Sequence, residues 1–393
     1  MTRVLVEQDP AADLAALRAA WADEATFAYL PQRAPLAADD VARILSGLPN
    51  HLRSGHVALL TSGSTGRPKL VIGARDRAAA LARALHAAQD NTRCAQAIVA
   101  LPLSYSFAFV NQWAWATEHG RDIVPTRGLA EPALLRAALE RAEDAMLCLV
   151  GVQAAMLIRT FPDAAFDGVA RLHFAGGRFP QEQLAALARL FPRAEVTNNY
   201  GCAEAMPRLT LRAAGASGDA SDIGRPLPGI ELRTDDAGRL LFRSPYGAVA
   251  VHEDGSLRTI ASTDWTATGD LAEPAGAGWR LLGRANEIFK RHGEKVSLPA
   301  VLDTVGTAWS GETGVYRATD RAGEDGYVLV LAPSADARQV RGILGALRAR
   351  HPRAQWPLRI EVAPALPRLH NGKLDHAALG RSGDRAVAWD QRI

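Results

Sequence analysis

The chain has 393 residues, 48% of them hydrophobic and 22% charged, and its formal net charge is +3 at pH 7. These values are typical of a soluble globular protein with two or three domains. No block of like charges occurs, which argues against nucleic-acid binding, and neither a signal-peptide pattern nor an apolar stretch of membrane-spanning length is visible. We therefore expect a cytoplasmic protein without membrane contact. The three cysteines, Cys94, Cys148 and Cys202, lack metal-ligand spacing and indicate reduced thiols.

The first informative segment follows two expected helices. Residues 14–22 suit a helix with Asp13 as its cap, and residues 37–48 suit a second helix. The apolar run 57–60 predicts a buried strand that leads into the sequence LTSGSTGRPK at residues 60–69. Glycines let backbone amides approach an anion, and hydroxyl groups and an ammonium donate further hydrogen bonds. The segment therefore predicts a phosphate-binding loop, with an ordinary polar loop as the alternative.

This loop differs from the Walker loop, because Gly63 and Gly66 are too close together and Pro68 separates Gly66 from Lys69. Lysine is otherwise rare in a chain that has 45 Lys and Arg residues together. The four lysines are Lys69, Lys290, Lys295 and Lys373. A lysine that persists where the chain generally uses arginine indicates a place that needs a compact ammonium. The alternative is that these few lysines are present by chance.

Residues 75–197 alternate between expected helices and strands. Helices are expected at 75–89 and 184–190, and strands at 97–103, 144–150, 169–175 and 195–197. Such repetition predicts an α/β fold with a largely parallel sheet, in which ligands bind at the carboxyl ends of the strands. Gly63, Gly176 and Gly201 each follow an expected strand, so we expect all three to line one crevice.

The pattern changes near residue 221. Short β-like pieces at 229–233, 239–243 and 279–282 predict a β-rich part over about 221–284, with a hairpin turn at 236–238. A small α/β unit follows. Its strands are expected at 314–317, 327–331 and 358–362, with a helix from residue 334 and then the loop that carries Lys373. We therefore predict an N-terminal domain over 1–284 and a C-terminal domain over 287–393.

Six segments of the chain occur together in the order found in one protein family. They read TSGSTGRPK, NNYGCAEA, DIGRPLPG, TGDLA, GRANEIFKRHGEKV and LPRLHNGKL. Over roughly residues 55–375 the chain thus resembles the adenylate-forming superfamily, which includes acyl- and aryl-CoA synthetases, nonribosomal adenylation domains and luciferase-like enzymes. The resemblance implies a large N-terminal domain of layered α/β sheets with a β-rich subdomain, and a small, mobile C-terminal α+β domain.

The resemblance also implies a reaction. ATP, with Mg²⁺, would activate an aryl or short to medium acyl carboxylic acid as an acyl-adenylate. The acyl group would then pass to a thiol, either of coenzyme A or of the phosphopantetheine arm of an acyl carrier protein. Acid and acceptor cannot be chosen from the sequence.

Residue roles follow from the same resemblance. The implied nucleotide-binding residues are Thr61, Ser62, Gly63, Ser64, Thr65, Gly66, Lys69, Tyr200, Gly201, Asp270 and Arg284. Lys373, Glu204 and Lys69 would be catalytic. Glu204 would hold Mg²⁺, Tyr200 would flank the adenine, and Asp270 would accept hydrogen bonds from the ribose hydroxyls.

Two further groups of residues complete the implied site. The acid pocket would contain Tyr105, Phe107, Phe109, Gly176, Gly177 and Asn199. A row of aromatics such as Tyr105, Phe107 and Phe109 is, taken alone, more often part of a hydrophobic core. Asn286 would be the hinge before the C-terminal domain, and Lys290 and Gly293 would face the site during thiol transfer.

Three departures from the family pattern stand out. Ala203 takes the place of the usual threonine, and Tyr105 stands where a histidine is frequent. The stretch before the first loop is short, which implies a reduced N-terminal region and leaves a homodimer open.

Two other interpretations remain. One is an adenylate-forming enzyme that transfers to an amine or another nitrogen nucleophile. The other is a degenerate, non-catalytic nucleotide-binding relative. The joint presence of Lys69, Glu204, Asp270, Arg284 and Lys373 argues against the degenerate relative.

Overall fold

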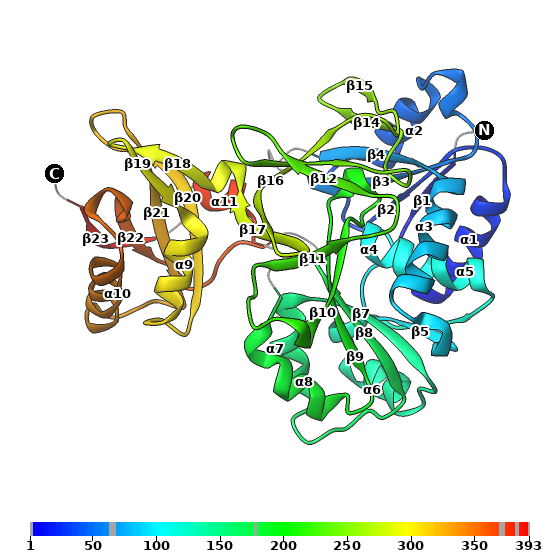
Figure 1. Cartoon of the computed structure of the whole chain (residues 1–393), viewed down its shortest axis with the longest axis horizontal. Helices are drawn as coiled ribbons and strands as arrows, with labels where there is room; N and C mark the ends of the chain where they lie inside the picture. The colour runs from blue at the N-terminus through cyan, green and yellow to red at the C-terminus, as the bar shows by residue number, and fades with distance from the viewer. Residues whose placement is uncertain (1–2, 63–67, 177–178, 369–373, 382–384, 392–393) are drawn as a thin grey trace. The chain divides into compact units, whose positions relative to one another are not determined.

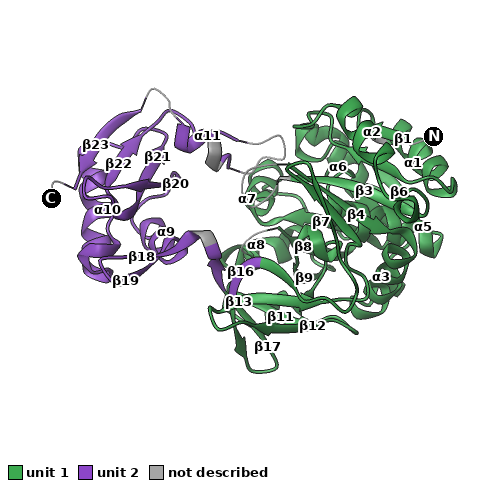
Figure 2. Cartoon of the chain, turned by 90° about the horizontal axis from the view of Figure 1, so that it is seen from above, with its two compact units in different colours: residues 1–268, 272–281 green, residues 269–271, 282–393 purple. Residues whose placement is uncertain are grey.

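The computed structural model describes residues 3–62, 68–176, 179–368, 374–381 and 385–391, and only the backbone of Pro10, Ser62, Asn286, His376 and Ala377. The chain divides into two compact units (Figure 2). The first comprises residues 1–268 and 272–281, and the second comprises residues 269–271 and 282–393. The predicted division at 284–287 and the mobility of the C-terminal domain stay predictions.

The first unit begins with helices close to those expected (Figure 1). Its helices are α1 (Pro10–Ala22), α2 (Ala38–Ser46), α3 (Arg75–Ala88), α4 (Ser106–Ala108), α5 (Trp115–His119), α6 (Pro132–Glu140), α7 (Gly151–Thr160) and α8 (Leu184–Leu190). The predicted cap of α1 was wrong: Asp9 Oδ1 accepts from the backbone amides of Ala11 and Ala12 at 3.1 and 3.0 Å, and Asp13 lies inside the first turn. Proline suits the first helical position, so the helix begins at Pro10 and its cap is the residue before it.

A six-stranded sheet carries the expected phosphate-binding loop. Its strands, in spatial order, are β1 (Arg3–Val6), β2 (Phe27–Leu30), β3 (His56–Ser62), β4 (Pro68–Ala74), β14 (Ala250–Glu253) and β15 (Ser256–Thr259). β1, β2 and β3 are parallel, whereas β3 and β4 pair antiparallel with Ser62 opposite Pro68. The loop at 63–67 therefore connects two neighbouring antiparallel strands.

An eleven-stranded sheet forms the rest of the first unit's framework, although residues 269–271 of its strand β16 and 282–284 of its strand β17 are assigned to the second unit. Its strands, in spatial order, are β12 (Glu231–Thr234), β13 (Arg239–Arg243), β16 (Thr266–Ala275), β17 (Gly278–Arg284), β11 (Asp222–Pro226), β10 (Thr210–Ala213), β9 (Glu195–Tyr200), β8 (Val169–Ala175), β7 (Ala145–Val150), β5 (Gln96–Val99) and β6 (Asp122–Pro125). β6, β5, β7, β8 and β9 are parallel. The parallel arrangement was predicted for β5, β7, β8 and β9, whereas the strand β6 was not predicted. The predicted hairpin between β12 and β13 is confirmed.

The predicted β-rich stretch is present, and antiparallel pairing of β10 with both β9 and β11 joins it to the parallel strands. One sequence prediction about these sheets needs correction. β3 belongs to the smaller sheet, while Gly176 and Gly201 follow β8 and β9 of the larger one. The three glycines therefore do not follow strands of a single parallel sheet. In the sequence the strands before them read as one alternating series, but β3 pairs antiparallel with β4 in the smaller sheet.

Alternating side chains build layers around these two sheets. On β2, Phe27 and Tyr29 face the core shared with α3 and the larger sheet, whereas Ala28 and Leu30 face α2. The other face of the larger sheet packs against α6, α7 and α8 through a separate cluster that includes Leu147. The first unit thus stacks helix, sheet, helix, sheet and helix layers.

The second unit is a small α+β structure. A hairpin of β18 (Ile288–Arg291) and β19 (Glu294–Ser297) precedes a four-stranded sheet of β20 (Glu312–Thr319), β21 (Asp325–Ala332), β22 (Arg359–Val362) and β23 (Ala386–Asp390). The helices α9 (Leu298–Gly306) and α10 (Ala337–Arg350) pack on one face, and α11 (His376–Arg381) packs on the other. Among the described residues of the whole chain, no helix has both the length and the apolar character that a membrane span requires.

Candidate active site

Lys69 lies between two carboxylates in the first unit. Its Nζ is 3.5 Å from Glu204 Oε1 and 3.3 Å from Glu253 Oε2, and the Lys69 side chain is only 15% exposed. Thr61 stands directly opposite Lys69 across the β3–β4 pair. The cluster of Lys69, Glu204 and Glu253, called the lysine cluster below, therefore sits at the open end of the hairpin that holds the expected phosphate-binding loop.

Backbone pairing brings the two glutamates to this lysine. β14 pairs antiparallel with β4, with His252 opposite Leu70, so Glu253 falls beside Lys69. Glu204 comes from the loop after β9, in a short 3₁₀ turn at Ala203–Ala205. The backbone amide of Ala248 donates to the Glu204 carbonyl at 2.9 Å, just before β14 begins. Residues 248–253 thus hold the backbone of Glu204 and carry Glu253.

The loop after β9 folds tightly back on itself. A Cβ at Gly201 would lie 1.7 Å from the Pro207 carbonyl oxygen, so only glycine fits there. The Leu209 amide donates to the Tyr200 carbonyl at 2.9 Å. Met206 packs over β4, since a Cβ at Gly73 would lie 2.3 Å from its terminal methyl carbon. These contacts place Tyr200 and Glu204 at the junction of the two sheets.

The carboxylates of the lysine cluster suit a magnesium ion. Mg²⁺ prefers oxygen ligands and is commonly held by one or two carboxylates together with substrate phosphates. Within the described ranges no group of three or more His, Cys, Asp and Glu side chains is arranged to hold a metal by itself. Glu204 and Glu253 therefore fit an ion that is shared with a phosphate ligand.

The predicted ribose-binding residues form an ion pair. Asp270 is 4% exposed, and its Oδ1 lies 3.0 Å from Arg284 Nε. The preceding residue, Gly269, has a φ of +83°, which favours glycine at this turn in the strand. A carboxylate oriented by a guanidinium is well placed to accept hydrogen bonds from hydroxyl groups.

The predicted hinge and thiol-transfer residues also lie in the second unit. Asn286 is in the 3₁₀ turn Ala285–Glu287, where the Glu287 carboxylate accepts from the Arg284 amide at 3.2 Å. Lys290 is exposed on β18 and pairs across the hairpin with Lys295. Gly293 forms the turn with a φ of +81°. The hairpin thus presents two of the chain's four lysines from adjacent positions.

Two of the predicted acid-pocket residues, Tyr105 and Gly176, meet directly. A Cβ on Gly176 would lie 2.5 Å from the Tyr105 hydroxyl oxygen. The segment before Tyr105 is held by Glu7, which accepts from the Leu103 amide at 2.7 Å and from the Ser104 hydroxyl at 2.6 Å. Burial raises the pKa of Glu7, which these two hydrogen bonds only partly offset. The acid-pocket segment is thereby fixed to the smaller sheet.

Phe107 and Phe109 lie in a helix with an unusual middle. Residues 106–119 form one continuous helical segment whose centre, Phe109–Ala114, is π-helical. Phe109 is fully buried, with ring centroids 6.0 Å from Trp21 and 4.9 Å from Trp113. Its side chain therefore belongs to the core, and its predicted contact with an acid stays a prediction. The π turn is a feature that recurs at functional sites.

Arg208 joins the aromatic segment to β9. Its guanidinium donates to the side-chain oxygens of Asn111, from the π turn, and of Asn199, from β9. Asn111 in turn donates to the Phe107 carbonyl at 3.0 Å. Burial lowers the pKa of Arg208 to about 9. The predicted pocket residues Phe107 and Asn199 are thus connected through a buried cation.

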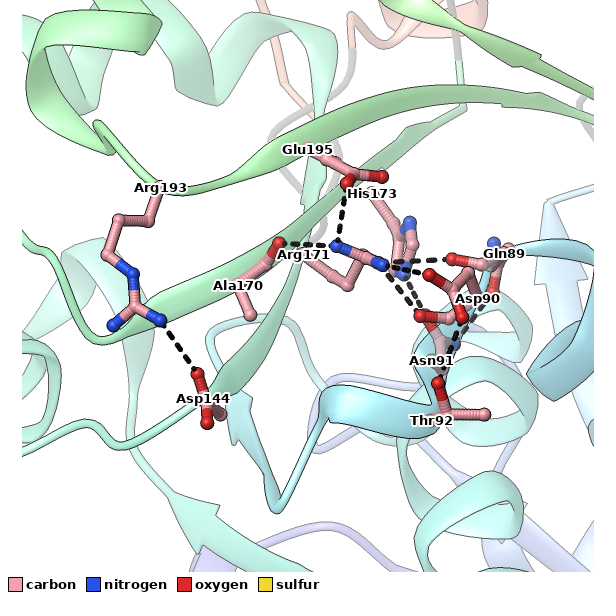
Figure 3. Close-up of polar contacts among 10 residues, drawn as sticks. All are labelled: Gln89, Asp90, Asn91, Thr92, Asp144, Ala170, Arg171, His173, Arg193 and Glu195. Carbon is pink, nitrogen blue, oxygen red and sulfur yellow. Dashed lines mark hydrogen bonds and ion pairs between the residues drawn. The ribbon is translucent and has the colours of Figure 1, made fainter.

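A second buried arginine braces the other end of the same strands (Figure 3). Arg171 pairs with Asp90 at 2.8 Å and Glu195 at 3.4 Å. It also donates to the backbone carbonyls of Gln89 and Asp90, just after α3. His173, beside it, contacts Thr197 at 2.7 Å and Asn91 at 3.2 Å. Burial, aided by the charges of Arg208 and Arg171, lowers the pKa of His173 to about 3. The imidazole is therefore neutral at physiological pH.

Several predicted site residues lie outside the described ranges. These are Gly63, Ser64, Thr65, Gly66, Gly177 and Lys373. Their proposed contacts with phosphate, acid or ATP remain predictions, as do the ligand roles of the other residues.

Sequence reasoning missed Glu253 and Arg208. The Asp254-Gly255 turn that follows Glu253 is a hairpin signal, and Asp254 indeed has a φ of 50°. Nothing in the sequence, however, shows that β14 pairs with β4. Arg208 follows the NNYGCAEA motif by only three residues, but it resembles any of the chain's many arginines until its burial is known.

The layered sheets and this arrangement of residues define an adenylate-forming fold. The AMP-binding enzyme family matches residues 4–259, and the chain belongs to that family. O-succinylbenzoate coenzyme A synthetase (MenE) from Bacillus subtilis, solved with ATP and magnesium, has a TM-score of 0.76 at 17% identity, covering 96% of this chain and 89% of that one. The amide bond synthetase McbA from Marinactinospora thermotolerans has a TM-score of 0.72 at 18% identity, with 96% and 88% coverage.

A curated relative matches across most of the chain. The non-ribosomal peptide synthetase CmlP of Streptomyces venezuelae is 25% identical over 382 residues. The match covers 93% of this chain but 37% of CmlP, so the chain spans little more than a third of that relative. Similar proteins thus include a coenzyme A synthetase, an amide synthetase and a peptide synthetase.

Proposed function

We propose that the chain activates a carboxylic acid with ATP. An oxygen of the acid attacks the α-phosphorus, the bond to the β-phosphate oxygen breaks, and pyrophosphate leaves with that electron pair. The products of this half are an acyl-adenylate and pyrophosphate. The acyl carbon is then attacked by a thiol of coenzyme A or of a carrier protein's phosphopantetheine; AMP leaves and the thiol loses its proton.

The lysine cluster carries this proposal. A lysine at the end of a hairpin loop rich in glycine and hydroxyl groups is suited to hold the β- and γ-phosphates, and the reaction needs groups that balance the charge of a polyanion. Glu204 and Glu253 would hold Mg²⁺, which when bound offsets phosphate charge. Family membership supports the use of the nucleotide.

The remaining residues take roles suited to their chemistry. Tyr200, at the end of β9, would flank the adenine. Asp270, oriented by Arg284, would accept hydrogen bonds from the ribose hydroxyls. Lys373 would stabilise the charge that moves from the acid onto phosphorus. Lys290 and Gly293 would meet the thiol acceptor after the C-terminal domain has moved about Asn286.

The direct test measures pyrophosphate release with ATP and Mg²⁺ across aryl and linear acids, with hydroxylamine as the trap. The Lys373→Ala variant is the comparison. We expect release with one class of acid and a loss of more than about 100-fold in the variant, as removal of a charge-stabilising group implies. Nucleotide binding without pyrophosphate release from any acid would instead favour a non-catalytic relative.

The acceptor is tested separately. Coenzyme A, a holo carrier protein and a primary amine are each added to the working acid and ATP, and AMP release is followed. We expect a thiol to accelerate AMP release. Acceleration by the amine alone would move this chain to the nitrogen-acceptor reaction, the activity named for the neighbour McbA.

A further inference from the structure

Arg208 differs from the other deeply buried arginines of the described chain. Three arginines are among the largest fully buried side chains: Arg171, Arg208 and Arg291. Arg171 has Asp90 and Glu195 as counter-charges (Figure 3), and Arg291 lies 3.6 Å from Asp320. In the parts of the chain that the structure describes, Arg208 contacts no carboxylate. Its charge is therefore the one among the three that lacks a partner of opposite sign.

The surroundings of Arg208 consist of neutral amides. Besides Asn111 and Asn199, the Gln89 side chain lies against it. With its oxygen turned toward the guanidinium, Gln89 accepts from the two terminal nitrogens at 3.0 and 3.2 Å. Nε is buried without a hydrogen-bond partner among the described residues. Amide oxygens solvate a cation but do not neutralise it, and an unpaired buried charge is costly.

The position of this cation matters for the acid. Asn199 and Phe107 are the expected acid-pocket residues that the Arg208 contacts reach, directly and through Asn111. Asn111 itself comes from the π turn. A guanidinium binds a carboxylate through two parallel hydrogen bonds. A substrate carboxylate that takes over the place of the Asn199 oxygen would supply the missing negative charge.

We propose that Arg208 determines acid specificity, and that the chain activates an acid with a second carboxylate, which pairs with the Arg208 guanidinium. This inference rests on the proposed acid activation. One carboxylate of the diacid reacts with ATP, and the other remains ionised and anchors the far end of the molecule. The class of substrate is thus a dicarboxylic acid.

Matched pairs of acids test the proposal. Pyrophosphate release is measured for adipate against hexanoate and for terephthalate against benzoate. In the wild type we expect kcat/KM for at least one diacid to exceed that for its monoacid by about 10- to 100-fold, the range that a charged hydrogen-bonded contact supports. In Arg208→Met this preference disappears, because the second carboxylate of the diacid loses its cationic partner. Arg208→Lys keeps the charge but loses the paired geometry, and retains part of the preference.

A control and a binding measurement complete the design. Arg171→Lys changes a buried arginine that has its own counter-charges, and we expect it to leave the preference unchanged. The preferred diacid should raise the Tm of the wild type but not that of Arg208→Met, which reports binding independently of turnover. If Arg208→Met does not fold, Arg208→Lys and the Tm shift of the wild type decide.

The outcomes separate the two proposals. Monoacid turnover without diacid preference, or a preference that survives in Arg208→Met, would overturn the role of Arg208 and leave acid activation intact. Absence of pyrophosphate release with every acid, together with no diacid-induced Tm shift, would remove both.

Discussion

Single residues decide how the proposed site treats charge. Lys69 is not a free ammonium awaiting phosphate, because two carboxylates hold it at 3.3 and 3.5 Å. Phosphate oxygens must compete with Glu253 and Glu204 for the same ammonium. Of the two, Glu253 is the more exposed, at 29% against 16%, and is the easier to displace.

Replacing Glu253 tests this competition. In Glu253→Gln the proposed Mg²⁺ site loses one of its two carboxylates, so we expect the KM for ATP in pyrophosphate release to rise about two- to fivefold. Glu140→Gln, which removes an exposed partner of Arg136, is the matched control and should leave this KM unchanged. A lowered KM in Glu253→Gln would show that Glu253 mainly competes with phosphate for the Lys69 ammonium.

Gly201 illustrates a residue whose necessity is steric. Gly201→Ala places a Cβ against the Pro207 carbonyl, so we expect a loss of about 3 kcal/mol in the free energy of unfolding and weaker ATP binding as the loop shifts. Gly218→Ala, at an open position, should change stability by less than about 0.5 kcal/mol. Denaturation midpoints of the two variants check the difference. Equal midpoints would mean that the loop relaxes without cost.

At the scale of elements, sequence patterns located individual strands well and their partners poorly. β8 at 169–175 and β13 at 239–243 have the predicted bounds, because apolar runs and turn residues mark strand ends locally. The pairing of β4 with β14 joins segments about 180 residues apart, and no local signal encodes it. Glu253 could not be predicted for the same reason.

The contacts between polar side chains of neighbouring strands could not be predicted from the sequence either. His173, Thr197 and Asn199 occupy strands that read as ordinary buried or alternating segments. Only the packed structure shows that they form a network with Asn91 and the two arginines. For the site, the sequence could supply Lys69, Glu204 and Asp270 from motifs, but not the counter-charges that surround them.

This network predicts a pH dependence of stability. The folded-state pKa of His173 is about 3, below its ordinary value of 6.5, so between these values the unfolded chain binds a proton that the folded chain does not. The free energy of unfolding should therefore fall as pH decreases below 6.5, by up to about 1.4 kcal/mol per pH unit from this group. Above 6.5 this contribution is constant.

Denaturant unfolding at pH 7, 5.5 and 4.5 measures the slope. His173→Asn lacks the titrating imidazole and should show a shallower dependence on pH, whatever its stability at pH 7. His51→Asn, at an exposed position, should follow the wild type. Parallel slopes in the wild type and His173→Asn would contradict the assignment.

At the scale of the whole molecule, the proposed site residues are distributed over both units. The first holds the lysine cluster and Tyr200, and the second holds Asp270, Lys290 and the segment before Lys373. If the C-terminal domain moves about Asn286 between the two half-reactions, stiffening this residue should separate them.

Asn286→Pro makes that test, because proline restricts its own φ and the residue before it. We expect pyrophosphate release to stay within about threefold and AMP release with the thiol acceptor to fall at least about tenfold, since only the second step requires the movement. The preferred control is Ala335→Pro, in the loop before α10. Asn50→Pro is unsuitable, because Asn50 is the first residue of a 3₁₀ turn. An equal loss in both half-reactions would argue against a hinge at Asn286.

The pairing of Lys69 with Glu204 and Glu253 has a consequence for the protein in a crowded cell. An unguarded ammonium beside backbone amides would attract any abundant anion, and inorganic phosphate or a product could block the entrance. A simple anion that binds here gains little free energy, because it must first displace the carboxylates of Glu204 and Glu253 from Lys69. Only a ligand that also brings a cation for those carboxylates recovers the loss. The proposed site would thereby discriminate between a metal-bound triphosphate and simple anions before any chemistry begins.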